Sequence, residues 1–295
     1  FNFDIGFHEF VELGERPVEE VHQFSDAVNS VFFEWIAARP SGRPFFAFLH
    51  TTDPHEPYTP REPYRGALAN DVLNPAITKG PSARRALAAD PTMDVEQLRR
   101  DMEHLYDAEI AFNDAQFGVL VERLEAAGLY DSLLIIVLSD HGEEFQEHRG
   151  WSHGTTLYQE VVHVPLLVKL PGQARAGERV AQIAQHIDIF PTVMQVVGLD
   201  YSIAGSGVSL LDLPDLEIAQ RRPAVSHLAH TDALTESVRV GAAKLIRRVR
   251  PDGVTWTRLF DLAEDPAETM GLARPVTQGL LRTILKRATL AENSS

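Results

Sequence analysis

The sequence predicts an α/β fold in which a doubly wound, mostly parallel sheet is followed by a smaller C-terminal α+β part. Short continuous apolar runs, typical of buried parallel strands, occupy residues 44–49, 133–138 and 164–170. Apolar residues at helical spacing lie between these runs, as a doubly wound sheet requires. After about residue 215 the pattern changes to shorter strand-like segments. We therefore expect one domain over residues 1–215 and a second over residues 216–295.

The first half of the chain alternates helical and strand patterns. Residues 17–38 carry apolar side chains at helical spacing and predict a helix that leads into the strand at 44–49. Residues 56–96 are rich in proline and glycine and read as a long surface loop, a kind of segment that is often functional. Residues 94–128 form the strongest helical pattern, with Gly128 as its stop signal.

The second half continues the alternation and then changes character. Residues 187–198 predict a helix with a proline in its first turn and a glycine just past its end. Residues 224–228 are strand-like, and residues 243–250 and 254–260 flank a Pro-Asp-Gly turn, which predicts an antiparallel hairpin. Residues 277–290 predict a C-terminal helix.

Composition and charge exclude several classes of protein. The 295 residues include 27 Lys+Arg and 42 Asp+Glu, for a formal charge of −15, so the chain lacks the basic face that nucleic-acid binding needs. No apolar stretch approaches the ~20 residues that span a bilayer. The absence of cysteine excludes a zinc ribbon and a thiol nucleophile within these residues.

Histidine and aspartate follow two of the three predicted strands directly. His50, Asp53 and His55 come after the first strand, and Asp140 with His141 come after the second. Ligands of open parallel sheets collect beyond the carboxyl ends of the strands. Carboxylate and neutral imidazole suit a divalent metal, which stabilises negative charge on a phosphoryl or sulfuryl group. On these residues alone, a turn-capping aspartate beside an ordinary polar histidine remains the alternative.

Longer motifs around these residues resemble the sulfatase family of the alkaline-phosphatase superfamily, and the resemblance spans nearly the whole chain. It is carried by Ser139-Asp140-His141-Gly142-Glu143-Glu144-Phe145, Glu147-His148, Trp151-Ser152-His153-Gly154-Thr155-Thr156-Leu157-Tyr158-Gln159-Glu160, the upstream block from Phe45 to Tyr58, Tyr106-Asp107 with Asp114, the block from Gln185 to Thr192, and the block from Leu259 to Glu268.

This resemblance implies an alkaline-phosphatase/sulfatase-like fold and a metal-dependent hydrolase that cleaves sulfate esters. Asp140 and His141 match half of the family's metal site. His55 matches the histidine that contacts the bound sulfate. His153 occupies the position of a Lys or His that stabilises the leaving-group oxygen, and histidine suits general acid catalysis near neutral pH. We therefore expect metal ligands at Asp140 and His141, and catalytic and substrate-binding roles for His55 and His153.

The resemblance also implies one divalent metal ion and an anionic substrate, a small-molecule or glycan sulfate or phosphate ester. Ca²⁺, Mn²⁺ or Mg²⁺ is expected, and Zn²⁺ less so. The alcohol part of the ester is left open because variable loops such as residues 59–96 build that side of the pocket. His50, Glu143, Glu144 and His148 are weaker candidates for a direct role.

Two departures from the family pattern leave alternatives open. A histidine at position 141 also occurs in phosphonate and phosphate ester hydrolases of the superfamily. The Cys/Ser-x-Pro-x-Arg motif that yields the formylglycine nucleophile and the Asp-Asp pair of metal ligands are both missing. We therefore expect the chain to lack the N-terminal part of a longer enzyme. The compartment, whether periplasmic, secreted or cytoplasmic, and the oligomeric state are left open.

Three alternatives to a sulfatase therefore remain. One is a phosphodiesterase or phosphonate monoester hydrolase, another is a phosphoglycerol-transferase relative, and the third is a catalytically inactive binding protein with this fold. A nucleophile encoded upstream of Phe1 would distinguish them.

Overall fold

The computed structural model describes residues 4–13, 24–200, 207–213, 222–230, 233–253 and 255–272, together with positions 279, 281 and 283. The chain divides into two compact units, Phe1–Tyr130 and Asp131–Ser295, and each is described here by itself. The division after residue 130 separates the helical part from the strands. The proposed domain boundary at residue 215 remains a prediction.

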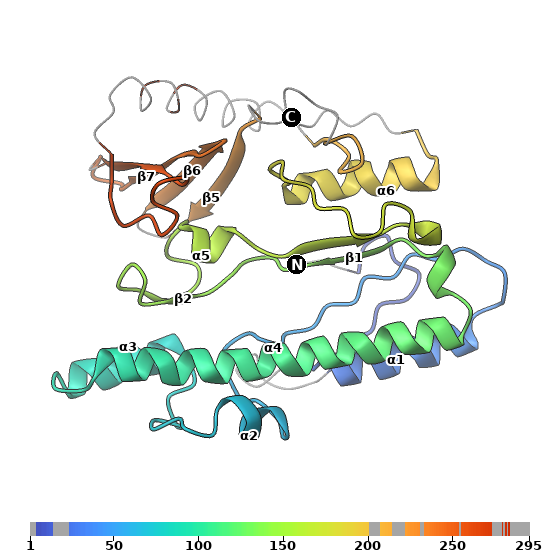
Figure 1. Ribbon diagram of the computed structural model, residues 1–295, viewed down its shortest axis with the longest axis horizontal. Helices are drawn as coiled ribbons and strands as arrows, with labels where there is room; N and C mark the ends of the chain where they lie inside the picture. Colours follow the sequence, from blue (N-terminus) through green and yellow to red (C-terminus); the bar gives the residue numbers. More distant parts are fainter. Residues whose placement is uncertain are drawn as a thin grey trace. The chain divides into compact units, whose positions relative to one another are not determined.

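The first unit is built from helices, drawn in blue to green in Figure 1. The long helix α4 begins after Asp94, whose carboxylate accepts hydrogen bonds from the backbone N–H groups of Glu96 and Gln97 at 3.0 Å. It ends before Gly128, which has φ +67°. The helix predicted over 94–128 is confirmed. The helices of this unit are α1 (Ser25–Ala38), α2 (Tyr64–Leu68), α3 (Gly80–Ala89) and α4 (Val95–Ala126).

The core of this unit lies where α1 packs against α4. Phe32 and Phe33 of α1 and a row of buried side chains on α4 at helical spacing supply it; the row is Leu98, Met102, Leu105, Ala108 and Phe112. Arg123 of α4 covers the ring of Phe33 at 3.8 Å. The helix predicted over 17–38 is confirmed from Ser25 onward, and residues 14–23 lie outside the described part of the chain.

The prediction of a buried strand at residues 44–49 is wrong for the described structure. The segment pairs with no strand among the described residues, and the side chains of Phe46 and Phe48 are 65% and 66% exposed. Phe45 is partly covered by the rings of Trp35 and Phe32 on α1, and Phe46 stacks on the ring of Phe7. An apolar run indicates that a segment can be buried, but a strand also needs a neighbour to complete its hydrogen bonds.

Residues 56–96 are more regular than the predicted surface loop, because they contain α2 and α3. Both helices are short, and the proline-rich segments around them hid the helical pattern.

The second unit holds all the strands that the structure describes, in three sheets. Its strands are β1 (Ile135–Leu138), β2 (Glu144–Phe145), β3 (Trp151–Ser152), β4 (Leu166–Lys169), β5 (Ala224–Ala229), β6 (Leu234–Val240), β7 (Ala243–Val249) and β8 (Thr255–Asp261). Its helices are η1 (Tyr130–Ser132, which begins at the last residue of the first unit), α5 (Gln159–Val162), η2 (Pro171–Gln173), η3 (His186–Asp188) and α6 (Ile189–Val197).

The strands predicted at 133–138 and 164–170 form β1 and β4, but they pair antiparallel, with Leu138 opposite Leu166. The expectation of parallel neighbours is therefore wrong for this pair. Apolar runs show that strands are buried and carry no information on their direction. Figure 1 shows α6 lying over the β1–β4 pair, and α6 ends at the left-handed Gly198 as predicted.

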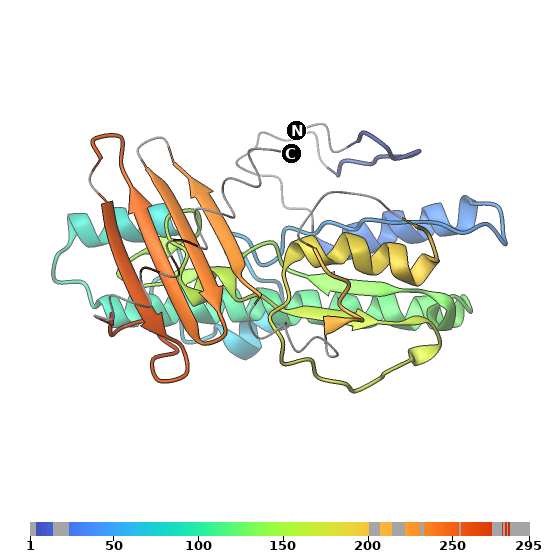
Figure 2. The ribbon, with the colours of Figure 1, turned by 90° about the horizontal axis from the view of Figure 1, so that it is seen from above.

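The four strands β5 to β8 form one antiparallel sheet, drawn in orange in Figure 2. The predicted hairpin is confirmed as β7 and β8. Strand β6 was missed because its interior carries Thr235, Glu236 and Ser237, polar residues that are nevertheless buried. One face of the sheet is closed by a core cluster of Val238, Leu245, Leu259 and Leu281.

The helix predicted over 277–290 lies almost entirely outside the described residues. Across the described parts of the chain, no helix combines the length and apolar character that crossing a bilayer would take.

Candidate active site

The loop that follows β1 is held tightly against α5. The N–H of Gly142 donates to the carbonyl of Val161 at 2.8 Å, and a Cβ at position 142 would lie 2.1 Å from the carbonyl oxygen of Glu160. Only glycine permits this approach. Ser139 closes the other side of the loop by donating from Oγ to the carbonyl of His141 at 2.5 Å. The two residues between Ser139 and Gly142 are therefore presented in a fixed turn.

Asp140 and His141 offer an oxygen and a nitrogen ligand side by side. The Asp140 side chain is 80% exposed, and its Oδ2 lies 3.7 Å from Nε2 of His141. Nδ1 of His141 lies 2.9 Å from the carbonyl of Gly142. Because a carbonyl only accepts hydrogen bonds, Nδ1 carries the proton and Nε2 presents its lone pair.

This donor set fits a divalent metal ion. Metal–ligand bonds of ~2.0–2.6 Å place two ligand atoms of one ion at about the separation seen here. The Nδ1–H bond to Gly142 fixes the ring and its tautomer, which is the usual arrangement around a metal-binding histidine.

His153 lies against this pair. Its ring stacks on that of His141, with centroids 4.0 Å apart. Nδ1 of His153 lies 3.1 Å from Oε1 of Glu143, a carboxylate buried beneath the site. The carboxylate accepts the Nδ1 proton and fixes the orientation of the imidazole. The structure thus brings together three of the four predicted site residues and gives Glu143, a weaker candidate, an orienting contact.

The fourth predicted residue, His55, belongs to the first unit. Its backbone N–H donates to Thr52 and its Nδ1 to the carbonyl of Glu56, both at 2.6 Å. The loop that carries it is anchored by Asp53, whose Oδ2 accepts from the backbone N–H and hydroxyl of Ser25. Because His55 and His153 belong to different units, a shared site for them remains a prediction. The same holds for His50.

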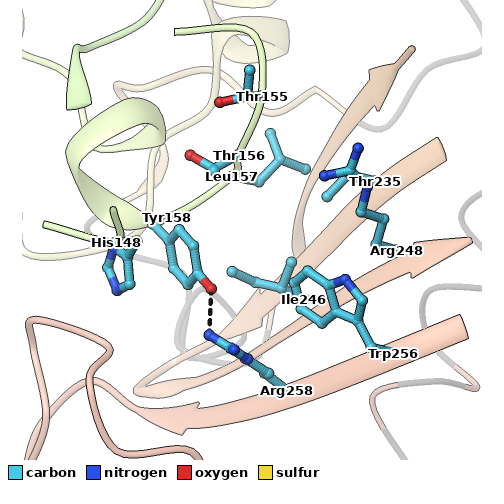
Figure 3. Close-up of a pocket in the computed structure, with 10 residues that line it drawn as sticks. All are labelled: His148, Thr155, Thr156, Leu157, Tyr158, Thr235, Ile246, Arg248, Trp256 and Arg258. Carbon is cyan, nitrogen blue, oxygen red and sulfur yellow. Dashed lines mark hydrogen bonds between the residues drawn. The ribbon is translucent and has the colours of Figure 1, made fainter. Parts of the chain in front are cut away.

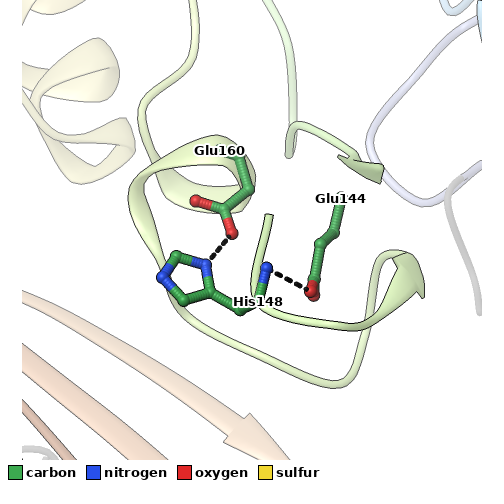
Figure 4. A group of neighbouring side chains, drawn as sticks. All are labelled: Glu144, His148 and Glu160. Atoms are coloured by element: carbon green, nitrogen blue, oxygen red, sulfur yellow. Dashed lines mark hydrogen bonds and ion pairs between the residues drawn. The ribbon is translucent and has the colours of Figure 1, made fainter. Parts of the chain in front are cut away.

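A second group of acidic and histidine side chains, Glu144, His148 and Glu160, has ligand atoms within 4.8 Å of one another (Figure 4). Oε1 of Glu144 accepts from the backbone N–H groups of His148 and Gly150, at 3.2 and 2.7 Å, and Oε2 accepts from Thr156. These bonds hold the β2–β3 hairpin together, so this carboxylate has a structural role.

His148 is tied into the same group through both ring nitrogens. Nδ1 bonds Oε1 of Glu160 at 2.6 Å, and Nε2 faces the carbonyl of Glu268 at 3.1 Å. Burial lowers the pKa of His148, but the hydrogen bond and charge of Glu160 outweigh it and raise the pKa above its ordinary value. Both ring nitrogens of His148 already face oxygen acceptors, so neither presents a free lone pair to a metal ion. Asp140 and His141 therefore fit a metal ion better than this group does.

Comparison with known proteins assigns the family. Residues 7–199 match the family model Sulfatase, and residues 146–292 match the model described as N-sulphoglucosamine sulphohydrolase, C-terminal. The chain belongs to the sulfatase family. Sulfatases generally bind a divalent metal ion, and the assignment of Asp140 and His141 as its ligands stays a prediction.

Several curated relatives of this chain carry arylsulfatase names. Arylsulfatase K of Mus musculus is 32% identical over 185 residues, covering 59% of this chain and 33% of that protein. Arylsulfatase K of Homo sapiens is 31% identical over 184 residues, covering 59% and 34%. The multifunctional alkaline phosphatase superfamily protein PehA of Trinickia caryophylli is 28% identical over 235 residues, covering 70% and 44%. The chain thus spans about a third of the length of the arylsulfatases it matches.

Solved structures agree on the fold. BT4656, solved with its substrate D-glucosamine-2-N,6-O-disulfate, has a TM-score of 0.71 at 19% identity over 94% of this chain and 71% of that chain. The phosphonate monoester hydrolase of Agrobacterium radiobacter has a TM-score of 0.70 at 22% identity over 93% and 65%. The predicted α/β class and the alkaline-phosphatase-like architecture of this chain are confirmed.

Proposed function

We propose that the full-length protein is a metal-dependent hydrolase of sulfate esters. The observation that carries this proposal is the convergence of Asp140, His141 and His153, held in place by Glu143 and the Gly142 contact. Oδ2 of Asp140 and Nε2 of His141 would hold one divalent ion. Ca²⁺, Mn²⁺ or Mg²⁺ is the expected ion; because Ca²⁺ prefers oxygen ligands throughout, the imidazole of His141 favours Mn²⁺ over Ca²⁺. When bound, the ion would stabilise negative charge on the oxygens of the sulfuryl group.

His153 supplies the proton that the leaving alcohol needs. With Nδ1 directed to Glu143, Nε2 is the ring nitrogen that donates to the ester oxygen as its bond to sulfur breaks. The buried carboxylate stabilises the positive charge of the protonated ring before the transfer. His55 would bind the sulfuryl oxygens, and the nucleophile would come from a part of the protein outside these 295 residues.

A second candidate, hydrolysis of phosphonate or phosphate esters, is favoured by His141 itself and by the similarity to a phosphonate monoester hydrolase. Both reactions place a charged tetrahedral group at the same site. Relative kcat/KM values for 4-nitrophenyl sulfate, bis(4-nitrophenyl) phosphate and 4-nitrophenyl phenylphosphonate decide between them.

The roles of Asp140 and His153 are tested with the full-length gene product. Asp140→Ala should abolish hydrolysis of 4-nitrophenyl sulfate. His153→Ala should lower kcat by about 10²–10⁴ for phenyl sulfate, whose leaving group needs a proton, and by much less for 4-nitrophenyl sulfate, whose leaving group does not.

His104→Ala serves as the matched control, because His104 is a partly exposed residue of α4 whose Nδ1 pairs with Asp71 at 2.9 Å, in the first unit. It should leave both rates unchanged. Undiminished activity in Asp140→Ala and His153→Ala would disprove the assignment. If His153→Ala lowered kcat equally for both substrates, His153 would not be the proton donor, but the assignment as a hydrolase would stand.

A further inference from the structure

A cavity of about 230 Å³ lies within the second unit, next to the segment that carries His153. One wall is the face of the sheet formed by β6, β7 and β8, and the other is the segment Thr155–Tyr158 (Figure 3). Thr155 is two residues beyond His153, which is at most ~7 Å of extended chain. Nε2 of His230, after β5, donates to the carbonyl of Gly154 and joins the sheet to this segment.

Strand register places two arginines on the cavity wall. Thr235, Arg248 and Trp256 are direct cross-strand neighbours, and Ile246 and Arg258 form the next row on the same face. Nη1 of Arg258 donates to the hydroxyl of Tyr158 at 2.8 Å. A guanidinium has five N–H donors, so this bond orients Arg258 and uses only one of them.

Thr235 adds a polar atom without a protein partner. The residue is 2% exposed, and its Oγ1 makes no hydrogen bond within the described structure. A buried hydroxyl left in this state is costly unless a ligand satisfies it. It lies in the same row as Arg248, so one bound group could contact both.

The lining combines cationic and apolar surfaces. Arginine forks match the paired oxygens of carboxylate and sulfate groups. Trp256, Ile246 and Leu157 supply an apolar wall for the body of a ring that carries such a group. The chain has a net charge of −15, so a cavity lined by two arginines is a local positive region. Such a region favours an anionic ligand.

We propose that this cavity is a subsite for a second anionic group, a sulfate or carboxylate, on the sugar whose sulfate ester is hydrolysed. The proposal rests on the proposed function, because it identifies the substrates as sugars with at least two anionic groups. Arg258 and Thr235 would bind that second group, and Trp256 would pack against the ring.

The test compares two sugars that differ by one sulfate, glucosamine 6-sulfate and glucosamine 2-N,6-O-disulfate. Binding of each to the full-length gene product is measured by calorimetry. The disulfate should bind about tenfold tighter or more, and Arg258→Gln should remove that preference while the affinity for the monosulfate stays the same. Thr235→Val, which keeps the shape and removes the hydroxyl, should reduce the preference in part.

Arg250→Gln is the matched control, since Arg250 lies in the exposed turn between β7 and β8 and does not line the cavity. Equal binding of the two sugars by the unsubstituted protein, or an equal loss for both in Arg258→Gln, would overturn the subsite. Retained preference without hydrolysis would instead contradict the proposed function. Hydrolysis without preference would contradict the subsite alone.

Discussion

Glu109, on α4, is a buried carboxyl group whose two oxygens have different surroundings. Oε1 accepts from the backbone N–H of Thr59 at 2.5 Å, and Oε2 has no hydrogen-bond partner in the described structure. Burial raises the pKa of Glu109 to about 8, with a further contribution from the negative charge of Asp53, against the hydrogen bond from Thr59. The carboxyl is therefore protonated in the folded state at neutral pH.

This raised pKa makes stability depend on pH. The unfolded carboxyl ionises near pH 4.5, whereas the folded one keeps its proton up to about pH 8. Between these two pH values the folded state therefore binds more protons than the unfolded state. The free energy of unfolding falls as pH rises through this range, by up to about 1.4 kcal/mol per pH unit. Glu109→Gln keeps the shape and removes the proton. In urea denaturation, the free energy of unfolding of the variant relative to that of the unsubstituted protein should be higher at pH 8 than at pH 5.

Glu122→Gln, at an exposed position of the same helix, controls for the loss of one acidic group and should show no such gain. A constant difference between Glu109→Gln and the unsubstituted protein over this range would mean that Glu109 ionises normally.

The residues that sequence could predict are those with their own chemical signature. Asp140, His141 and His153 stand out because carboxylate and imidazole follow a strand within motifs that resemble a family. Glu143 lies in the same motif but is one of two adjacent glutamates, and only its contact with His153 shows what it does. Thr235 gives no signal at all, since its position on the cavity wall depends on the register of strands distant in sequence.

At the scale of elements, the turn after β1 depends on one glycine. Gly142→Ala would place a methyl group 2.1 Å from the carbonyl oxygen of Glu160, so the backbone that carries Asp140 and His141 must move. We expect a loss of about 1–3 kcal/mol in the free energy of unfolding. Sulfate ester hydrolysis by the full-length protein should fall together with it.

Gly118→Ala is the matched substitution on α4. A Cβ there meets nothing within 4 Å, and the residue is helical, so the change should stabilise the protein by about 0.5–1 kcal/mol and leave activity unchanged. Thermal unfolding measures both variants. A stable Gly142→Ala protein would show that the turn tolerates a side chain.

Elements with local signals were predictable, and those that need partners were less so. The helix α4 has its cap, its apolar row and its stop in one stretch of sequence. The segment 44–49 has an equally strong apolar pattern but pairs with no strand among the described residues. The direction of β4 against β1 and the existence of β6 likewise depend on contacts between distant residues.

For the whole molecule, two metal ligands set a limit on affinity. Ca²⁺ sites gain affinity with each charged ligand, and Asp140 and His141 supply one carboxylate between them. We expect residues 1–295 alone to bind Ca²⁺ or Mn²⁺ with a Kd of about 1 mM or weaker, measured by calorimetry. Binding should disappear in Asp140→Ala, and a tight, stoichiometric site would contradict this expectation.

The exposed segment at residues 44–49 also affects how the chain behaves in concentrated solution. Phe46 and Phe48 are exposed on a segment that forms neither helix nor strand and pairs with no strand among the described residues. Unpaired backbone groups beside exposed apolar side chains can pair with a strand from another copy of the chain. The run Phe-Phe-Ala-Phe-Leu also combines apolar and aromatic side chains without a charge, which is the composition of aggregating segments. In residues 1–295 taken alone, these properties favour self-association through this segment.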